Sequence, residues 1–222
     1  MAPTFRYETS TQRYRYTSGL RKGQFVSEEQ IIKLTQSVIA SNKQSVMKVA
    51  DSLIGGKINL AEWEKQTVIA LKEMHIQSYL LGRGGLKNIT PNDYNIIENK
   101  LQSEYKYLRK FAQDIINVGM SSAQFAARLN LYLESAQGTY ELGRFHAHLT
   151  AGYNWEKRIR TKTESCDDCI MWAGMGWQPI GSLPNRGEKC QCRSRCGCKK
   201  LYSEEKPKDS LLMPIGWLRG DK

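Results

Sequence analysis

Hydrophobic residues recur every three or four positions along four successive stretches of the chain, a spacing typical of amphipathic helices. The first stretch begins at "SEEQ", where Ser27 can cap a helix and Gln30 follows three residues later. It ends at the paired glycines that start with Gly55. The second stretch fits residues 60–81, with Asn59 as its cap. We therefore expect two long helices before residue 82.

Two further helices are predicted by equally regular patterns. One begins at Thr90, where Pro91 suits the first helical position, and ends at Gly119. The other extends from about Ser121 to Thr150. Their apolar stripes are Tyr94, Ile97, Leu101, Tyr105, Leu108, Ala112 and Ile115 in the third helix, and Phe125, Leu129, Tyr132, Ala136, Tyr140 and Gly143 in the fourth. Residues 25–152 are thus predicted to form a bundle of about four helices, without a sheet.

The pattern changes after Gly152. The segment "WEKRIRTKTES" alternates like a short strand, and a stretch rich in Gly, Pro and Trp follows it. We assign residues 153–202 to a small C-terminal module, and residues 203–222 to a polar linker with the apolar tail "LLMPIGWL". No internal repeat is evident. The predicted fold class is mainly α, a helical bundle followed by a cysteine-rich module that contains short strands.

All six cysteines lie in this module, between positions 166 and 198. Cys166 and Cys169 form a C-x-x-C pair, and the later set comprises Cys190, Cys192, Cys196 and Cys198. Clustered thiols in a reducing compartment are typical of metal sites, whereas secreted chains use them as disulfides. One zinc ion bound by four of them, two ions that share all six, and three disulfides are all compatible with the spacing. We favour a single zinc ion held by Cys166, Cys169, Cys192 and Cys196, with Cys190 and Cys198 as alternates.

The predicted zinc site is structural. Catalytic zinc keeps an open coordination position and usually has histidine or carboxylate ligands, but no histidine lies in the cysteine segment. Asp167 and Asp168 are interpreted as residues of a solvated turn. A structural zinc ion would supply folding free energy on the order of 10 kcal/mol to a module that is too small for its own core. No nucleophile paired with a base and no phosphate-binding loop is recognisable, so no enzyme activity is expected.

The formal net charge of +11 points to an acidic or polyanionic partner. Residues 1–24 are interpreted as a basic arm without a core, either solvated or ordered on a neighbouring subunit or on phosphates. Basic side chains around the cysteines could contact DNA phosphates, or they could instead neutralise the thiolates. These side chains are Lys189, Arg193, Arg195, Lys199 and Lys200. No apolar run of about 18 residues and no apolar leader is present, so neither membrane contact nor secretion is expected.

The order of several short motifs resembles the phage head morphogenesis proteins, the Mu F-like minor capsid family. These motifs are "YELGRFHAHLTAGY", which contains Tyr140, Gly143 and Arg144, then "CDDC", "PIGSLPNRGEKC" and "CRSRCGC". The similarity covers residues 130–202. Family members often have His-Pro-Asn before the last cysteines, where this chain has "NRGEK".

The resemblance implies a structural minor head protein that is made in the host cytoplasm and built into the virion near the portal. Its partners would be the portal or capsid proteins, and its role head morphogenesis or DNA packaging and ejection. The alternative hypothesis is a zinc-ribbon protein that binds nucleic acid, whose DNA affinity would fall steeply with added salt.

Overall fold

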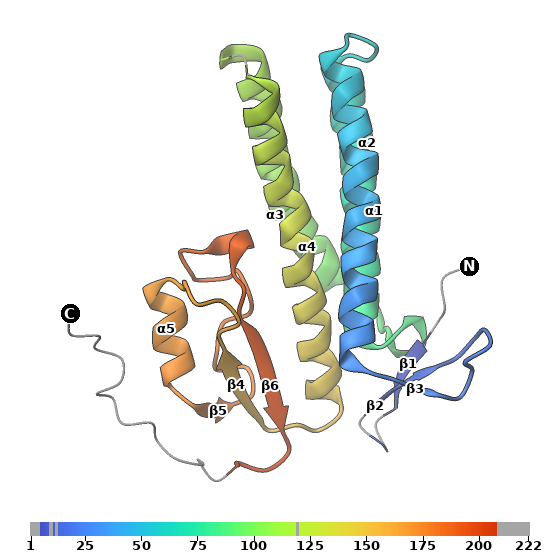
Figure 1. The fold of residues 1–222 in the computed structure, drawn as a ribbon, viewed down its shortest axis with the longest axis vertical. Helices are drawn as coiled ribbons and strands as arrows, with labels where there is room; N and C mark the ends of the chain where they lie inside the picture. The colour runs from blue at the N-terminus through green and yellow to red at the C-terminus, as the bar shows by residue number, and fades with distance from the viewer. Residues whose placement is uncertain (1–4, 9–10, 12, 119, 208–222) are drawn as a thin grey trace.

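The computed structural model describes residues 5–8, 11, 13–118 and 120–207, and it is predominantly helical. Four long helices run alternately up and down the molecule, and the C-terminal module lies beside the lower half of the bundle (Figure 1). These helices are α1 (Glu28–Ile54), α2 (Leu60–Arg83), α3 (Pro91–Val118) and α4 (Ser122–Thr150). The predicted fold class, a mainly α chain with a cysteine-rich C-terminal region of short strands, is confirmed.

The helices begin at the residues that the sequence marks as caps. The side chain of Ser27 accepts a hydrogen bond from the Gln30 amide at 3.2 Å, and the Gln30 side chain accepts one from the Ser27 amide at 3.1 Å. Asn59 caps α2 through the Glu62 amide at 2.9 Å. α2 ends at Gly84, whose φ of 88° is readily adopted only by glycine.

The core of the bundle is formed by apolar side chains from all four helices. Trp63 of α2 is completely buried, and its ring packs edge-on against Phe111 of α3, with the centroids 5.5 Å apart. The predicted stripe of α4 is buried throughout. Ile69 of α2 is exposed, and so is Tyr94, which belongs to the predicted stripe of α3. Ile69 lies two residues from the buried Thr67 and Leu71, which places it on the opposite face of α2.

The closest helix crossing joins α2 and α4, which run in the same direction. A Cβ atom built on Gly82 would lie 2.8 Å from the Arg144 nitrogen, and one built on Gly143 would lie 3.0 Å from the Arg83 nitrogen. Each would approach the carbonyl of a tyrosine on the other helix still more closely. The two glycines occupy the same place in a repeated pattern, Tyr-x-x-Gly-Arg, at 79–83 and 140–144. Hydrophobic periodicity alone does not reveal this repeat.

The N-terminal residues form a small sheet in place of the expected arm without a core. Strands β1 (Phe5–Glu8), β2 (Arg13–Tyr16) and β3 (Phe25–Val26) pair antiparallel in that order. Tyr14 and Tyr16 are buried against the start of α1 and the middle of α4, and the Tyr14 hydroxyl donates to the Gly82 carbonyl at 2.8 Å. The alternating tyrosines supply one apolar face, so the segment packs on its own bundle, across from the C-terminal module (Figure 1).

The C-terminal module is built on a three-stranded antiparallel sheet of order β5-β4-β6. Its elements are β4 (Trp155–Ile159), α5 (Asp167–Gly174), β5 (Trp177–Pro179), the 3-10 turn η2 (Arg193–Arg195) and β6 (Lys199–Ser203). The module packs on the last turns of α4, where the rings of His148 and Tyr202 stack with centroids 4.2 Å apart. The predicted strand at "WEKRI" is β4. The apolar tail at 211–218 lies outside the described residues.

Candidate metal centre

The first cysteine pair lies at the start of α5. Cys166 is the N-cap residue, with extended backbone, and Cys169 follows in the first turn. Residues three apart share one face of a helix, so both thiols project from the same side. Asp167 and Asp168 also occupy this turn, where negative charge is favoured by the helix dipole. The expected solvated turn is thus the beginning of a short helix.

The later cysteines lie on a tightly folded loop that faces α5. Gly187 has a φ of 76°, and a Cβ atom there would lie 2.8 Å from the Arg193 carbonyl oxygen. η2 then carries the chain from Cys192 to Cys196, whose amide donates to the Arg193 carbonyl at 3.0 Å. Arg193 itself has a φ of 47°, unusual for a residue with a side chain. These turns bring the later cysteines onto one side of the loop.

A carboxylate ties the two cysteine segments together. Asp168 Oδ2 accepts a hydrogen bond from the Gln191 amide at 3.0 Å, directly between Cys190 and Cys192. This bond holds the first turn of α5 against the later loop. This role of Asp168 could not be predicted from local sequence, because the contact spans 23 residues.

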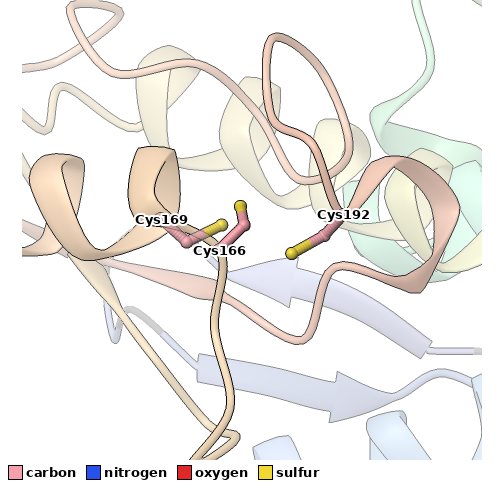
Figure 2. Close-up of side chains that lie close together, drawn as sticks. All are labelled: Cys166, Cys169 and Cys192. Atoms are coloured by element: carbon pink, nitrogen blue, oxygen red, sulfur yellow. The ribbon is translucent and has the colours of Figure 1, made fainter.

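The six thiols are free and gather in one cluster, of which four are buried. Two groups of three sulfur atoms have all members within 4.8 Å of one another. One group is Cys166, Cys169 and Cys192, whose side chains converge in Figure 2, and the other is Cys169, Cys196 and Cys198. Cys169 belongs to both groups. Such an arrangement can hold a metal ion.

The predicted ligands are distributed over both groups. Cys166, Cys169 and Cys192 come together, whereas Cys196 joins Cys169 and Cys198. The Sγ atoms of Cys169 and Cys196 are 3.7 Å apart. Two thiolates on one tetrahedral zinc ion are separated by about 3.8 Å, given Zn–S bonds of about 2.3 Å. This pair therefore has the separation that a shared ion requires, and which four thiols bind an ion stays a prediction.

One buried arginine lies against the sulfur atoms. Arg158 of β4 is 2% exposed, and its guanidinium donates to Cys196 Sγ at 3.3 Å and to the Pro184 carbonyl at 2.7 Å. The guanidinium carbon of Arg158 lies over the ring of Trp172, 4.9 Å from the ring centroid. Although burial opposes the charged form, hydrogen bonding to Cys198 and the negative charge of Cys196 raise the pKa of Arg158. A fixed positive charge therefore faces the cluster.

Hydrogen bonds among the thiols favour thiolate at particular positions. The hydrogen bond from Cys198 lowers the pKa of Cys196 to about 3 and raises the pKa of Cys198. At Cys166, burial is outweighed by hydrogen bonds from the Cys192 side chain and from backbone amides, which lower the pKa to about 7. Thiolate is the form that binds metal, so these groups are poised as ligands.

A buried ion pair supports the sheet beneath the cluster. Lys200 donates to Glu156 Oε2 at 2.9 Å and to the Asn185 side chain at 3.1 Å, and the Leu183 amide donates to Glu156 Oε1 at 2.7 Å. Lys200 is therefore engaged inside the module. Of the basic side chains considered for DNA contact, Lys189, Arg193 and Arg195 are exposed and Lys199 is half-buried. The positive surface of the module is thus smaller than the sequence indicates.

The histidines lie away from the cysteines, among the helices. His75 is buried and its Nδ1 lies 2.7 Å from the Thr139 hydroxyl. His146 contacts the Tyr79 hydroxyl at 2.9 Å, whereas His148 contacts the Arg144 carbonyl at 2.7 Å. Tyr79 also donates to Asp93, which pairs with Arg83 at 3.1 Å. This polar network lies beside the glycine crossing and was not predicted from the sequence.

No family model matches the sequence. Neither a curated protein nor a solved structure matches the chain. Among the described residues, no helix combines the length and the apolar character needed to cross a membrane.

Proposed function

We propose that this chain is a structural minor head protein of a bacteriophage, associated with the portal, whose C-terminal module is held together by zinc. The observation that carries the proposal is the all-thiol character of the cluster: both groups contain cysteine alone. Thiolate-only sites are typical of structural zinc, because catalytic sites leave a coordination position for water or substrate. An all-thiol site favours a structural, assembly role over an enzymatic one.

The identity of the metal follows from ligand chemistry. Soft thiolates favour zinc among the common divalent cations, whereas carboxylate and carbonyl oxygens favour magnesium and calcium. Asp168, in the same helical turn as Cys169, accepts a hydrogen bond from the Gln191 amide and is absent from both sulfur groups. Zinc bound here would join α5 to the loop of η2, two segments that the sheet alone does not connect.

The phage-head assignment is supported by the order of the Tyr-x-x-Gly-Arg motif, the C-x-x-C pair and the later cysteines. Tyr140, Gly143 and Arg144 lie within α4, which continues through Gly152 into β4. Gly143 contacts the backbone of α2, so this motif serves packing of the bundle. The far end of the bundle extends beyond the module (Figure 1). A protruding bundle and a metal-stapled module are suited to docking on larger assemblies.

The test is binding to the portal and major capsid proteins of the same phage. Purified full-length protein loaded with zinc is mixed with portal rings or with capsid protein and separated by size-exclusion chromatography. We expect co-elution with at least one of them, and loss of co-elution after chelation. The Cys192→Ser variant serves as a probe of the site, and Ser194→Ala, in the same loop, as its matched control. Folded, zinc-loaded protein that binds neither partner contradicts the proposal.

Contact with packaged DNA is a second property that one observation favours. Lys189, Arg193 and Arg195 are exposed on the loop that carries the later cysteines. If they contact phosphates, replacing all three with Gln lowers DNA affinity at low salt. It also reduces the slope of log affinity against log salt concentration by the equivalent of about three phosphate contacts. Affinity that is unchanged by the triple substitution, or independent of salt, contradicts DNA contact by this loop.

A further inference from the structure

Six thiols are two more than a single tetrahedral ion can bind. We propose that the two three-cysteine groups hold two zinc ions joined by the Cys169 thiolate, in one binuclear cluster that uses all six cysteines. The inference rests on the proposed zinc site and adds its stoichiometry and connectivity. Its basis is the position of Cys169, the one residue shared by the two groups of mutually close sulfur atoms.

The sulfur atoms fall on two sides of Cys169. Cys166 and Cys192 lie on one side, and Cys196 and Cys198 on the other. No group of four sulfurs is mutually close among the described residues, as one ion would require. Each side instead provides two thiols that share Cys169 as a third ligand. A thiolate has enough lone pairs to bind two metal ions at once, so Cys169 can bridge them.

Counting ligand positions identifies the remaining bridge. Two tetrahedral ions have eight coordination positions in total, and six thiolates fill eight positions when two of them bridge. Cys169 is one bridge, and Cys190 is the only cysteine outside the two groups. Cys190 is buried in the same cluster as Cys169, Cys196 and Cys198. Position assigns Cys169 as a bridge, whereas the ligand count alone assigns Cys190 as the second bridge, and the other four are terminal ligands. Because the Cys190 sulfur lies outside both groups, it would move towards the two ions when they bind.

The surrounding charge suits such a cluster. Two zinc ions and six thiolates leave a net charge of about −2 in a mostly buried site, and buried charge requires compensation. Arg158 supplies one positive charge, half of that compensation, because the same guanidinium nitrogen lies 3.3 Å from Cys196 Sγ and 3.7 Å from Cys169 Sγ. The arginine thus contacts the bridging sulfur and a terminal sulfur of one ion. A single ion would instead leave two of the clustered thiols without a metal.

The test combines metal counting with cadmium NMR on the full-length protein. Native mass spectrometry of zinc-loaded protein should give two zinc ions per chain. In protein reconstituted with ¹¹³Cd, two cadmium resonances are expected, and the Cys169 β-protons should show scalar coupling to both. The β-protons of Cys166 and Cys196 should each couple to one, and to different ions. One bound metal, or two cadmium ions without a shared cysteine, overturns the binuclear cluster.

Two variants test the roles of bridging and terminal ligands. Cys192→Ser removes a terminal ligand, so the ion bound by Cys196 and Cys198 should remain and the count should fall to one. Cys169→Ser should lower the count to zero or prevent folding of the module. A Cys192→Ser protein that keeps two ions with unchanged affinity contradicts the proposal. Absence of metal from the native protein would refute the zinc site as well, whereas a count of one refutes only the bridge and leaves the portal-binding test unaffected.

Discussion

Replacement of Arg158 is the most direct perturbation of the charge around the cysteine cluster. Arg158→Met keeps an unbranched side chain, but it removes the guanidinium, and with it the charge, all donors and the contact with the Trp172 ring. Two interactions of the guanidinium are short, 3.3 Å to Cys196 Sγ and 2.7 Å to the Pro184 carbonyl, whereas the contact with Cys169 Sγ is longer at 3.7 Å. The substitution therefore removes one strong bond to a proposed ligand and one bond to the loop that precedes the later cysteines.

The expected size of the effect follows from these contacts. A hydrogen bond to a charged group contributes about 1.5–3 kcal/mol. Loss of an outer partner of a metal ligand typically weakens metal binding about 10–100-fold, which corresponds to about 1.4–2.8 kcal/mol. Both figures agree, so we expect zinc affinity to fall at least tenfold. Arg158→Lys keeps the charge and should lose less.

Zinc affinity is measured by competition with a chromophoric chelator. Arg195→Met is the matched control, because it removes the same charge from an exposed side chain beside Cys196. Its affinity should stay within about twofold of the native protein, since exposed charges are screened by solvent and salt. Thermal unfolding of each variant without metal separates loss of folding from loss of binding. Equal affinities for Arg158→Met and Arg195→Met would refute the role assigned to Arg158.

Three further predictions concern the scaffold. Gly143→Ala should lower the free energy of unfolding by about 2 kcal/mol in urea titrations. The added methyl group forces the backbones of α2 and α4 apart, and this cost outweighs the gain of about 1 kcal/mol in helix propensity. Gly174→Ala is the control and should be near neutral, because open space surrounds Gly174. Burial lowers the pKa of His75 to about 3. The free energy of unfolding should therefore fall by about 1.4 kcal/mol per pH unit as the pH drops from about 6.5 towards 3, and His75→Gln should flatten this slope. Lys200→Met leaves the Glu156 carboxylate buried without its cationic partner. The free energy of unfolding of the module, measured by thermal unfolding, should fall by about 3–5 kcal/mol, and adding Glu156→Gln should recover part of this loss.

The helix boundaries could be predicted from the sequence because they depend on local interactions. The Ser27 cap and Gln30 are three residues apart, and so are Asn59 and Glu62, so the pattern and the contact share one scale. The glycine crossing is different. Gly82 and Gly143 meet only because α3 carries the chain to the far end of the bundle and α4 brings it back, and nothing local pairs the two motifs. Periodicity therefore identified the helices but not which pair packs most closely.

The candidate site was predictable as a set of residue types and not as an arrangement. The C-x-x-C spacing placed Cys166 and Cys169 together, but the division of the later thiols around Cys169 depends on the bond between Asp168 and the Gln191 amide. Arg158 was hidden in a run of basic residues. The alternation of β4 carried a signal, since Arg158 and Glu156 both fall on its buried face. Two buried charges on one strand face indicate that partners lie inside the module.

Metal removal tests whether the module and the bundle fold as separate units. The main core joins side chains of α1, α2, α3 and α4 and includes none from the module. α5 supplies 8 helical residues, against 27, 24, 28 and 29 in the bundle helices. Chelation should therefore reduce the far-UV helical signal by less than about a tenth, while the module becomes accessible to protease and hydrogen exchange. The packing of His148 on Tyr202 would be lost, so protection should also fall in the last turns of α4. Loss of most of the helical signal on chelation would contradict this division and make the cysteine cluster a requirement for the whole fold.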